Sequence, residues 1–328
     1  MNRDPNEETA LQLGKFDSDR RSQIQPFDPE EVARILGLNP DQIHNLSNID
    51  LKGIKLMGIN LARLNLEGAD LEEANLEGSN LSQTNLRNAN LRKANLNNIT
   101  GVEIDCRSAD LSYAQLRGSS LIRGNFEMAC LYSANLSCNF NQRTRLDFAN
   151  LKAANLARAA FQGVTLLYAN LTEANLRKAN FGPYQMNPET ASLSSDLTGV
   201  NLSNANLRKV ILNQAVLIKA NLRNANFRRG KLYQSNLNQA DLTNANLSYC
   251  DMRLISCEGS NFTGANFSDS DLAHGSFKGA TIKNIRLEIN SEDTNFTEAS
   301  FEQTDLHSAE LSHKMQQENK NIKWQRFD

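Results

Sequence analysis

The sequence is poor in aromatic residues and contains no long apolar run. Phe, Trp and Tyr together make up 6% of the 328 residues, and there is a single tryptophan. Globular cores draw much of their buried area from such rings, so one large conventional core is not expected. No apolar stretch approaches the ~18 residues of a transmembrane helix, and the opening "MNRDPNEETALQLGKF" lacks the apolar region of a signal peptide. We therefore expect a cytoplasmic protein that does not associate with a membrane.

Groups suited to catalysis or metal binding are also scarce. The four histidines are scattered, and the five cysteines show no metal-ligand spacing. An odd number of cysteines fits free thiols in a reducing compartment. No glycine-rich phosphate loop and no G-x-S-x-G nucleophile motif occurs. We expect no catalytic residues, no cofactor and no metal site, and hence a protein that is not an enzyme.

What the sequence has instead is a five-residue spacing. Leucine or a substitute recurs every five residues from Leu46 to Phe181, and a small residue such as Ala69 or Ala74 stands two positions earlier. On a helix, successive leucines would wander around the axis, and on a flat strand they would alternate between faces. The spacing works if each unit is a short extended piece followed by a corner, because every leucine then points inward. Asn and Asp, which favour tight turns, are common beside the leucines.

The tandem units "ANLRK", "ADLEE", "ANLNN" and "ADLTN" resemble those of pentapeptide-repeat proteins, over residues 46–311. The resemblance implies an all-β fold, a right-handed quadrilateral β-helix with four repeats per coil. The repeats would then form about 13 coils and, at the strand spacing of about 4.8 Å, a rod roughly 60 Å long.

The predicted boundaries follow from where the five-residue spacing holds. Phe181 and Leu197 are sixteen residues apart, which indicates eleven residues inserted at one corner. "DPEEVARILGL" predicts a short helix, because Asp28 suits the N-cap, Pro29 the first turn and Gly37 the end. We predict a disordered tail (1–26), a helical N-terminal cap (27–45), two solenoid parts (46–181 and 197–311), a loop insertion (182–196) and a C-terminal tail or cap (312–328).

Two smaller irregularities also carry predictions. In "CNFNQRTRL", Asn139 and Asn141 fall at both inward positions of one repeat, which predicts a local bulge, with Phe140 turned inward as an alternative. Leu287 and Phe296 are nine residues apart, which predicts a loop of four extra residues around "INSED".

Surface charge offers the candidate binding residues. With four repeats per coil, residues 20 apart lie above one another, so Arg208 stacks on Arg228 and Lys209 on Arg229, while Arg223 lies one face round. The inserted loop adds an aromatic residue and a methionine, which commonly make contacts. The candidate partner-binding residues are Arg208, Lys209, Arg223, Arg228, Arg229, Tyr184 and Met186.

These charges allow two interpretations. They form either an ordinary solvated surface or a docking patch for an acidic segment of another protein. Nucleic acid is not expected, because the patch is short and Tyr233 is isolated from any row of stacking rings.

Function is predicted as a protein-binding scaffold or regulator. The "ANL"-rich repeats resemble cyanobacterial family members, some of which regulate cell differentiation. One alternative implied by the family is a DNA-mimicking inhibitor or protector of DNA gyrase. Such a mimic, about 60 Å long, would face roughly 35 phosphate charges, whereas residues 46–311 carry equal numbers of basic and acidic residues. An architectural rod without a specific ligand is the other alternative. The resemblance also implies a monomer, or a dimer formed through the C-terminal segment.

Overall fold

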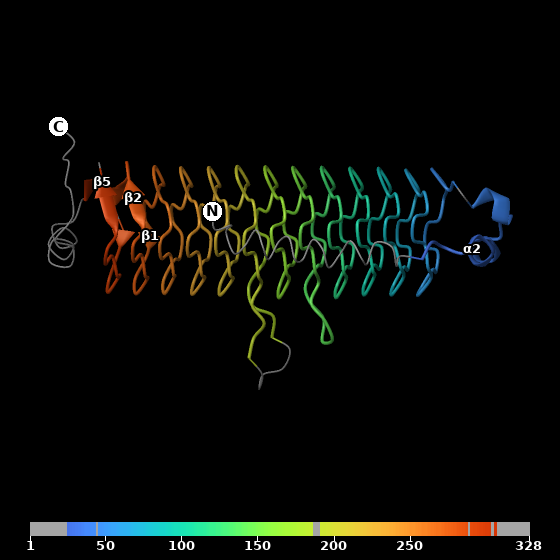
Figure 1. The fold of residues 1–328 in the computed structure, drawn as a ribbon, viewed down its shortest axis with the longest axis horizontal. Helices are drawn as coiled ribbons and strands as arrows, with labels where there is room; N and C mark the ends of the chain where they lie inside the picture. Colours follow the sequence, from blue (N-terminus) through green and yellow to red (C-terminus); the bar gives the residue numbers. More distant parts are fainter. Residues whose placement is uncertain (1–24, 44, 186–190, 288, 303–304, 307–328) are drawn as a thin grey trace, which may run out of the picture.

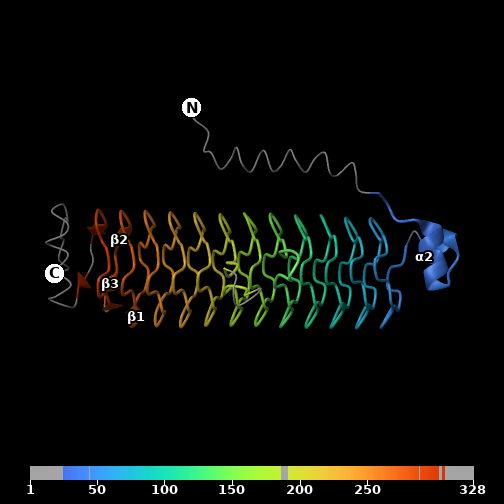
Figure 2. The ribbon, with the colours of Figure 1, turned by 90° about the horizontal axis from the view of Figure 1, so that it is seen from below.

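The chain forms a straight rod of stacked coils. The computed structural model describes residues 25–43, 45–185, 191–287, 289–302 and 305–306. Figures 1 and 2 show the coils following one another along a single axis, with the one α-helix of the described residues at the N-terminal end. Two loops leave the rod on the same side near its middle.

Parallel backbone pairing between residues twenty apart defines each coil. Asp50 pairs with Asp70, and Asp70 in turn with Asn90. The amide of Leu71 donates to the carbonyl of Asn90 at 2.7 Å, and the amide of Asn90 donates to the carbonyl of Ala69 at 3.0 Å. Twenty residues are four five-residue units, so each unit forms one side of a four-sided coil.

Within each unit, two residues face the interior and the corner residues face solvent. Leu71 and Ala74 are fully buried, and the amide of Ala74 closes the turn on the carbonyl of Leu71 at 3.0 Å. Between them Glu73 has a φ of 59°, and the same left-handed conformation recurs at the second corner residue in nearly every unit. The interior is therefore a continuous apolar column along the rod.

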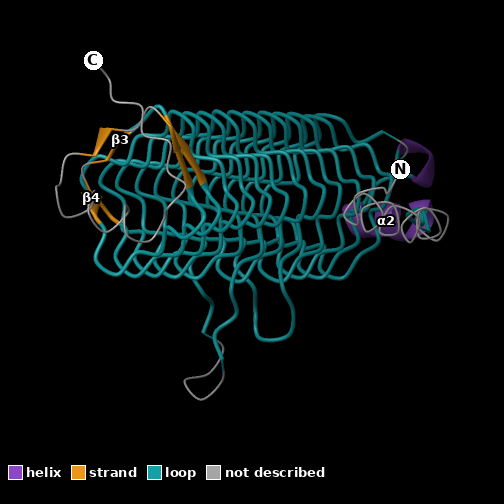
Figure 3. Cartoon of the chain, turned by 60° about the vertical axis from the view of Figure 1, so that its left-hand side comes forward, coloured by secondary structure: helices purple, strands orange, loops and turns teal. Residues whose placement is uncertain are grey.

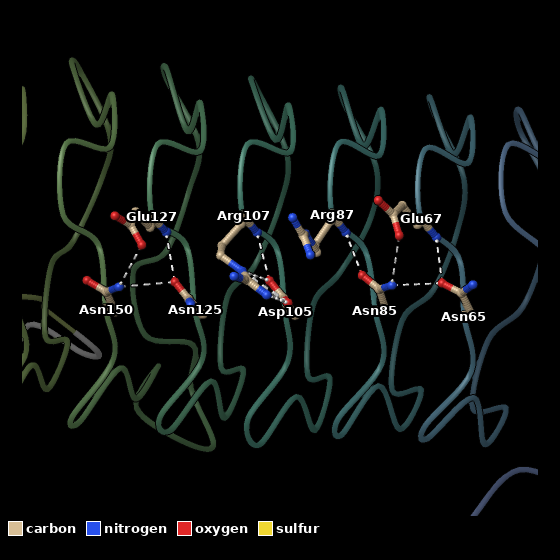
Figure 4. Close-up of polar contacts among 9 residues, drawn as sticks. All are labelled: Asn65, Glu67, Asn85, Arg87, Asp105, Arg107, Asn125, Glu127 and Asn150. Carbon is tan, nitrogen blue, oxygen red and sulfur yellow. Dashed lines mark hydrogen bonds and ion pairs between the residues drawn. The ribbon is translucent and has the colours of Figure 1, made fainter.

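Asparagine side chains reinforce the corners from outside the column. The side-chain oxygen of Asn85 accepts from the backbone amide of Arg87 at 3.2 Å, and its nitrogen donates to Asn65 of the preceding coil at 2.8 Å. Figure 4 shows the same two kinds of bond at Asn125 and Asn150, whereas Asp105 between them binds Arg107 and interrupts the stacking of asparagines. Asparagine thus serves both the turn and the stacking of coils.

The first interruption lies between Cys138 and Thr144. Before it, paired residues are twenty apart, but Ser120 pairs with Arg145 and Asn135 with Ala160, twenty-five apart. One complete repeat is therefore looped out of the coil.

The predicted local bulge is confirmed, whereas the alternative of an inward Phe140 is wrong. The side chain of Asn139 donates to Asn98 at 2.6 Å, and its oxygen accepts from the amide of Asn141 at 2.9 Å. Asn141 is exposed, and 72% of Phe140 is exposed. Polar bonds on the surface replace the costly burial of two amides.

The second interruption adds eleven residues. Thr165 pairs with Asp196, and Asn180 with Ile211, so paired residues are thirty-one apart. Coils stacked on either side keep regular pairing, and the described residues of the insertion extend outward from one corner (Figure 3).

At each interruption, the hydroxyl group of the residue where the chain re-enters the rod bonds to nearby backbone groups of the rod. The hydroxyl of Thr144 accepts from the amide of Gly118 at 2.8 Å and bonds the carbonyl of Ser137 at 3.0 Å. Likewise the hydroxyl of Ser195 accepts from the amide of Gly163 at 3.0 Å and donates to the carbonyl of Phe161 at 2.8 Å. Each hydroxyl satisfies backbone groups that the missing regular repeat would otherwise have paired.

The C-terminal end of the described rod contains short strands. They are β1 (Ser270–Asp271), β2 (Thr281–Lys283), β3 (Arg286–Leu287), β4 (Ile289–Asn290), β5 (Ser300–Glu302) and β6 (Asp305–Leu306). They pair in parallel as β1 with β4, β2 with β5 and β3 with β6.

Here Thr281 pairs with Ser300 and Arg286 with Asp305, nineteen residues apart. The prediction of a four-residue loop near "INSED" was wrong, because the chain shortens one coil by a residue. The hydroxyl of Thr294 still donates to the carbonyl of Leu272 at 2.9 Å, the same bond that Thr84 makes to Leu61 in a regular coil.

At the other end, helix α2 spans Pro29–Leu36 and a 3₁₀ turn, η1, spans Pro40–Gln42. Asp28 accepts the amide of Glu30 at 3.0 Å, and Gly37 ends the helix with a φ of 69°. Val32 is fully buried in the same apolar cluster as the first leucines of the column. Residues 1–24 and 307–328, which include the predicted C-terminal tail, lie outside the described residues.

Replacing Asp28 with alanine is expected to destabilise α2 by about 1 kcal/mol, because the first-turn amide of Glu30 loses its acceptor. Faster hydrogen exchange of the α2 amides would show this. Asp41→Ala removes an exposed carboxylate from the neighbouring turn and serves as the control. Equal exchange in the two variants would contradict the capping role.

None of the helices in the described part of the chain has the length and apolar composition needed to cross a membrane.

Candidate partner-binding site

Seven cationic side chains line one corner of the rod in four successive coils. The amide of Arg158 donates to the carbonyl of Arg177 at 3.0 Å, which places one coil on the next. In the same way, the amide of Lys178 donates to the carbonyl of Arg208 at 3.0 Å, and the amide of Lys209 donates to the carbonyl of Arg228 at 3.1 Å. We call this set the basic corner: Arg158, Arg177, Lys178, Arg208, Lys209, Arg228 and Arg229.

The sequence indicated only part of this corner. Arg208 and Lys209 lie above Arg228 and Arg229, at the spacing of twenty used for the prediction. The neighbouring pair, Arg177 and Lys178, was missed because the loop insertion places it thirty-one residues before Arg208 and Lys209. Adding the eleven inserted residues to the spacing would have found it.

The basic corner differs from other charged parts of the rod in lacking acidic partners. Among the described residues, no carboxylate forms an ion pair with any of its seven cations. Arg107, in contrast, bonds Asp105 at 2.5 Å on another corner, where Glu67 and Glu127 also bond asparagine amides (Figure 4). Stacked cations without a local counter-charge create a concentrated positive potential.

The predicted candidate Arg223 does not belong to the basic corner. It lies at the preceding corner, where its guanidinium pairs with Asp241 at 3.0 Å. Burial opposes ionisation of Asp241, but bonds from Thr243 and Arg223 outweigh it and hold the pKa of that carboxyl below its usual value. Arg223 therefore already has an anionic partner.

Tyrosine rings stand at both ends of the basic corner. The guanidinium carbons of Arg228 and Arg229 lie 4.9 Å and 5.7 Å from the centroid of the Tyr249 ring. At the other end, that of Arg158 lies 6.0 Å from the Tyr132 ring. Such contacts orient guanidinium groups and contribute about 0.5–1 kcal/mol each at exposed sites.

Tyr233 is isolated from other rings, as predicted, since no ring–ring contact within the described residues includes it. The guanidinium of Arg253 lies 5.6 Å from its ring centroid. The rings beside the basic corner are Tyr132 and Tyr249, which the sequence analysis did not identify.

Both loops leave the rod from the corner next to the basic corner. We call residues 138–143 the short loop and residues 183–194 the long loop. They leave after Leu136 and Phe181, with the Phe161 coil between them. Within the long loop, Tyr184 and Leu193 pair in antiparallel fashion through bonds of 2.9 Å and 2.8 Å.

Two arginines link the loops to each other. Arg117 donates to the hydroxyl of Tyr184 at 2.8 Å and to the carbonyl of Cys138 at 3.3 Å. Arg143 donates to the carbonyl of Ser194 at 2.9 Å. The predicted site residue Tyr184 is thus a structural contact between the loops, while Met186 lies outside the described residues.

The family model for pentapeptide repeats matches most of the chain. It covers residues 45–83, 69–100, 102–137, 144–182, 195–232, 220–256 and 250–288. The chain belongs to the pentapeptide repeat family. The matched segments leave out residues 138–143 and 183–194, which are the short loop and the long loop.

Several solved pentapeptide repeat structures are similar to this chain. HetL, a protein involved in heterocyst differentiation regulation from the cyanobacterium Nostoc sp. strain PCC 7120, is 27% identical over 76% of this chain and 95% of its own, with a TM-score of 0.46. QnrB1, a plasmid-mediated fluoroquinolone resistance protein, is 14% identical over 83% of this chain and 96% of its own, with a TM-score of 0.29.

A pentapeptide repeat protein from the Arabidopsis thaliana thylakoid lumen is 23% identical over 38% of this chain and 81% of its own, with a TM-score of 0.26. No curated protein matches the chain.

The thiols of this pentapeptide repeat protein are free, and most serve as small apolar residues. Cys106 and Cys257 occupy leucine positions and Cys250 a small-residue position, and all three are buried. Burial raises the pKa of Cys250 to about 12 and that of Cys138 to about 11. Both thiols are therefore protonated and unreactive near neutral pH.

Proposed function

We propose that this protein is a non-enzymatic scaffold whose basic corner binds an acidic segment of another protein. The observation that supports this is the run of seven cations without acidic partners among the described residues. The backbone fixes their positions at the coil spacing of about 4.8 Å, so mutual repulsion persists until an anionic group approaches. Binding relieves that repulsion and is steered by the positive potential.

We also propose that the loops add a second contact to the same partner. The side of the rod between the two corners carries the paired residues Asn180, Ile211 and Lys231, so the corners are neighbours around the coil. Phe140 extends from the short loop with 72% of its surface exposed, and aromatic residues are frequent anchors at protein interfaces. A partner on the basic corner would reach this ring by extending across one side.

The proposal also gives a structural role to the N-terminal helix and to the stacked coils. Helix α2 would cap the apolar column at the N-terminal end and prevent end-to-end association of rods. The repeats would form about 13 coils, which gives a rigid support roughly 60 Å long for the binding surface.

Removing four charges from the basic corner is expected to abolish partner capture from the native cell extract. The variant combines Arg208→Ala, Lys209→Ala, Arg228→Ala and Arg229→Ala. Because Ala153 already occupies a left-handed corner position with a φ of 54°, alanine is compatible with this backbone. Proteins retained by the wild type at about 0.15 M salt and lost with the variant should contain acidic segments.

A second variant controls for net charge. It removes four cations at other corners: Arg87→Ala, Arg107→Ala, Arg223→Ala and Arg253→Ala. If this control loses the same proteins, or if the basic-corner variant keeps all of them, the basic corner is not the docking site. Inhibition of gyrase supercoiling by the purified wild type at submicromolar concentration would instead support the DNA-mimicking alternative.

A further inference from the structure

We infer that the element that binds the basic corner is an α-helix carrying a stripe of Asp or Glu, aligned with the long axis of the rod. This inference rests on the proposed function and adds the form of the acidic segment. Three observations support it: the spacing of the cations, the length of the basic corner and the pairing of cations within each coil.

The spacing of the coils is closer to one turn of a helix than to an extended chain. Successive coils stack at about 4.8 Å, a helix rises about 5.4 Å per turn, and same-side residues of an extended chain are about 6.6 Å apart. The basic corner spans three coil-to-coil steps. Over these steps the mismatch with the coil spacing adds up to about 2 Å for the acidic stripe of a helix and about 5 Å for an extended chain. Long arginine and lysine side chains can absorb the smaller difference, so a helix can place one acidic group against every coil.

The basic corner has a defined length. Beyond Arg228 and Arg229 the next coils place Tyr249 and then the exposed Asp269 at this corner. On the other side the corner is occupied by Tyr132 and Tyr113, whose ring centroids are 5.6 Å apart. The cationic stretch therefore covers about 14 Å, which is the length of a helix of about ten residues.

This length favours a helix over duplex nucleic acid. A duplex carries about one charge per 1.7 Å along its whole length, and its charges would continue past the cations onto Asp269. A short acidic helix can end where the cations end. The neutral rings of Tyr132 and Tyr249 would then flank its two ends.

Cations also occur side by side at three successive coils. Arg177 with Lys178, Arg208 with Lys209, and Arg228 with Arg229 each occupy the two residues of one corner. An acidic stripe on a helix likewise has two columns, because residues at i, i+3 and i+4 share one face. Each turn of the helix can thus present acidic groups to both cations of a coil.

Three fluorescent peptides, tested against the full-length protein, examine the inference. Each has about 20 residues, a length at which alanine-rich sequences form a helix. The first carries glutamates in one helical stripe on an alanine background. The second has the same composition with the glutamates distributed around the helix, and the third keeps the stripe but has a central proline that breaks the helix. Binding is measured by fluorescence anisotropy at low salt.

We expect the stripe peptide to bind about tenfold more tightly than either of the other peptides. Its affinity should also fall about tenfold or more in a variant that combines Arg177→Ala, Lys178→Ala, Arg208→Ala and Lys209→Ala. The four-cation control at other corners should retain the wild-type affinity.

The failures of the inference and of the proposed function are distinguishable. If all three peptides bind equally, and each loses affinity in the variant lacking Arg177, Lys178, Arg208 and Lys209, the helical inference is overturned. The acidic docking site of the proposed function would then still stand. No binding of any peptide would overturn both. Tighter binding of a duplex DNA oligonucleotide than of the stripe peptide, lost in the same variant, would identify the basic corner as a nucleic-acid site and overturn the inference.

Discussion

A Phe161→Ala variant is expected to lose about 3–5 kcal/mol of unfolding free energy. Phe161 is fully buried in the coil between the two loops, and its ring stacks on Phe181 of the next coil with centroids 4.6 Å apart and planes 4° from parallel. Removing the ring leaves a cavity in a narrow column whose neighbouring coils are held in place by backbone pairing. Because each coil contacts only its neighbours, the loss of hydrogen-exchange protection should concentrate around residues 136–181.

Phe140→Ala provides the matched control, since it removes the same side chain from an exposed position. We expect this variant to unfold at the wild-type temperature. Uniform loss of protection along the whole rod in the Phe161→Ala variant would show that the coils unfold as one unit, contrary to the nearest-neighbour expectation.

A Gly163→Ala variant is expected to displace both loops and expose the thiol of Cys138. Gly163 has a φ of 72°, and an added Cβ would lie 2.6 Å from the sulfur of Cys138 and 3.1 Å from the Cβ of Tyr184. The left-handed backbone costs an alanine roughly 1–2 kcal/mol, and the contact with sulfur adds to it. Buried Cys138, whose pKa is raised to about 11 by loss of solvent, should therefore alkylate much faster in the variant at pH 8.

Alkylation of Cys138 is followed by peptide mapping, with the other four cysteines as internal references. Gly279→Ala separates backbone strain from the steric contact, because Gly279 has a φ of 64° and no atom within 4 Å of an added Cβ. The Gly279 variant should leave Cys138 protected. Equal protection of Cys138 in both variants would mean that the loops do not depend on the space at Gly163.

The five-residue spacing predicted a closed path with every leucine inward, because the interior selects residues by size alone, and the family resemblance implied that this path is a β-helix. Each buried position needs only a leucine or a small residue, and Leu71 and Ala74 meet that requirement wherever they lie along the column. The spacing alone did not reveal the short loop, since five extra residues preserve the five-residue repeat. Asn139 and Asn141, at both inward positions of one repeat, nevertheless predicted a bulge there. A clue was present in the hydroxyl of Thr144 and the small corner residue Gly118, which together replace the lost backbone pairing.

The site was harder to predict because it depends on which coils become neighbours. Arg177 and Arg208 are thirty-one residues apart and nevertheless lie in stacked coils. The eleven extra residues between them belong to the long loop, which leaves the rod at the corner next to the basic corner. The connection between the loops through Arg117 and Tyr184 joins residues sixty-seven apart. No local pattern encodes such a contact, because it arises only after four coils have been stacked.

The left-handed corner conformation has a consequence for how binding surfaces arise in this rod. Lys178, Lys209, Ala153 and Glu173 all adopt φ values between 54° and 63°, although their side chains differ in size and charge. The backbone therefore presents whatever residue stands at a corner without changing shape. Recognition can be altered by single substitutions at corners while the interior residues that determine stability stay the same, so a charged surface can be lengthened, shortened or moved by whole coils without redesigning the fold.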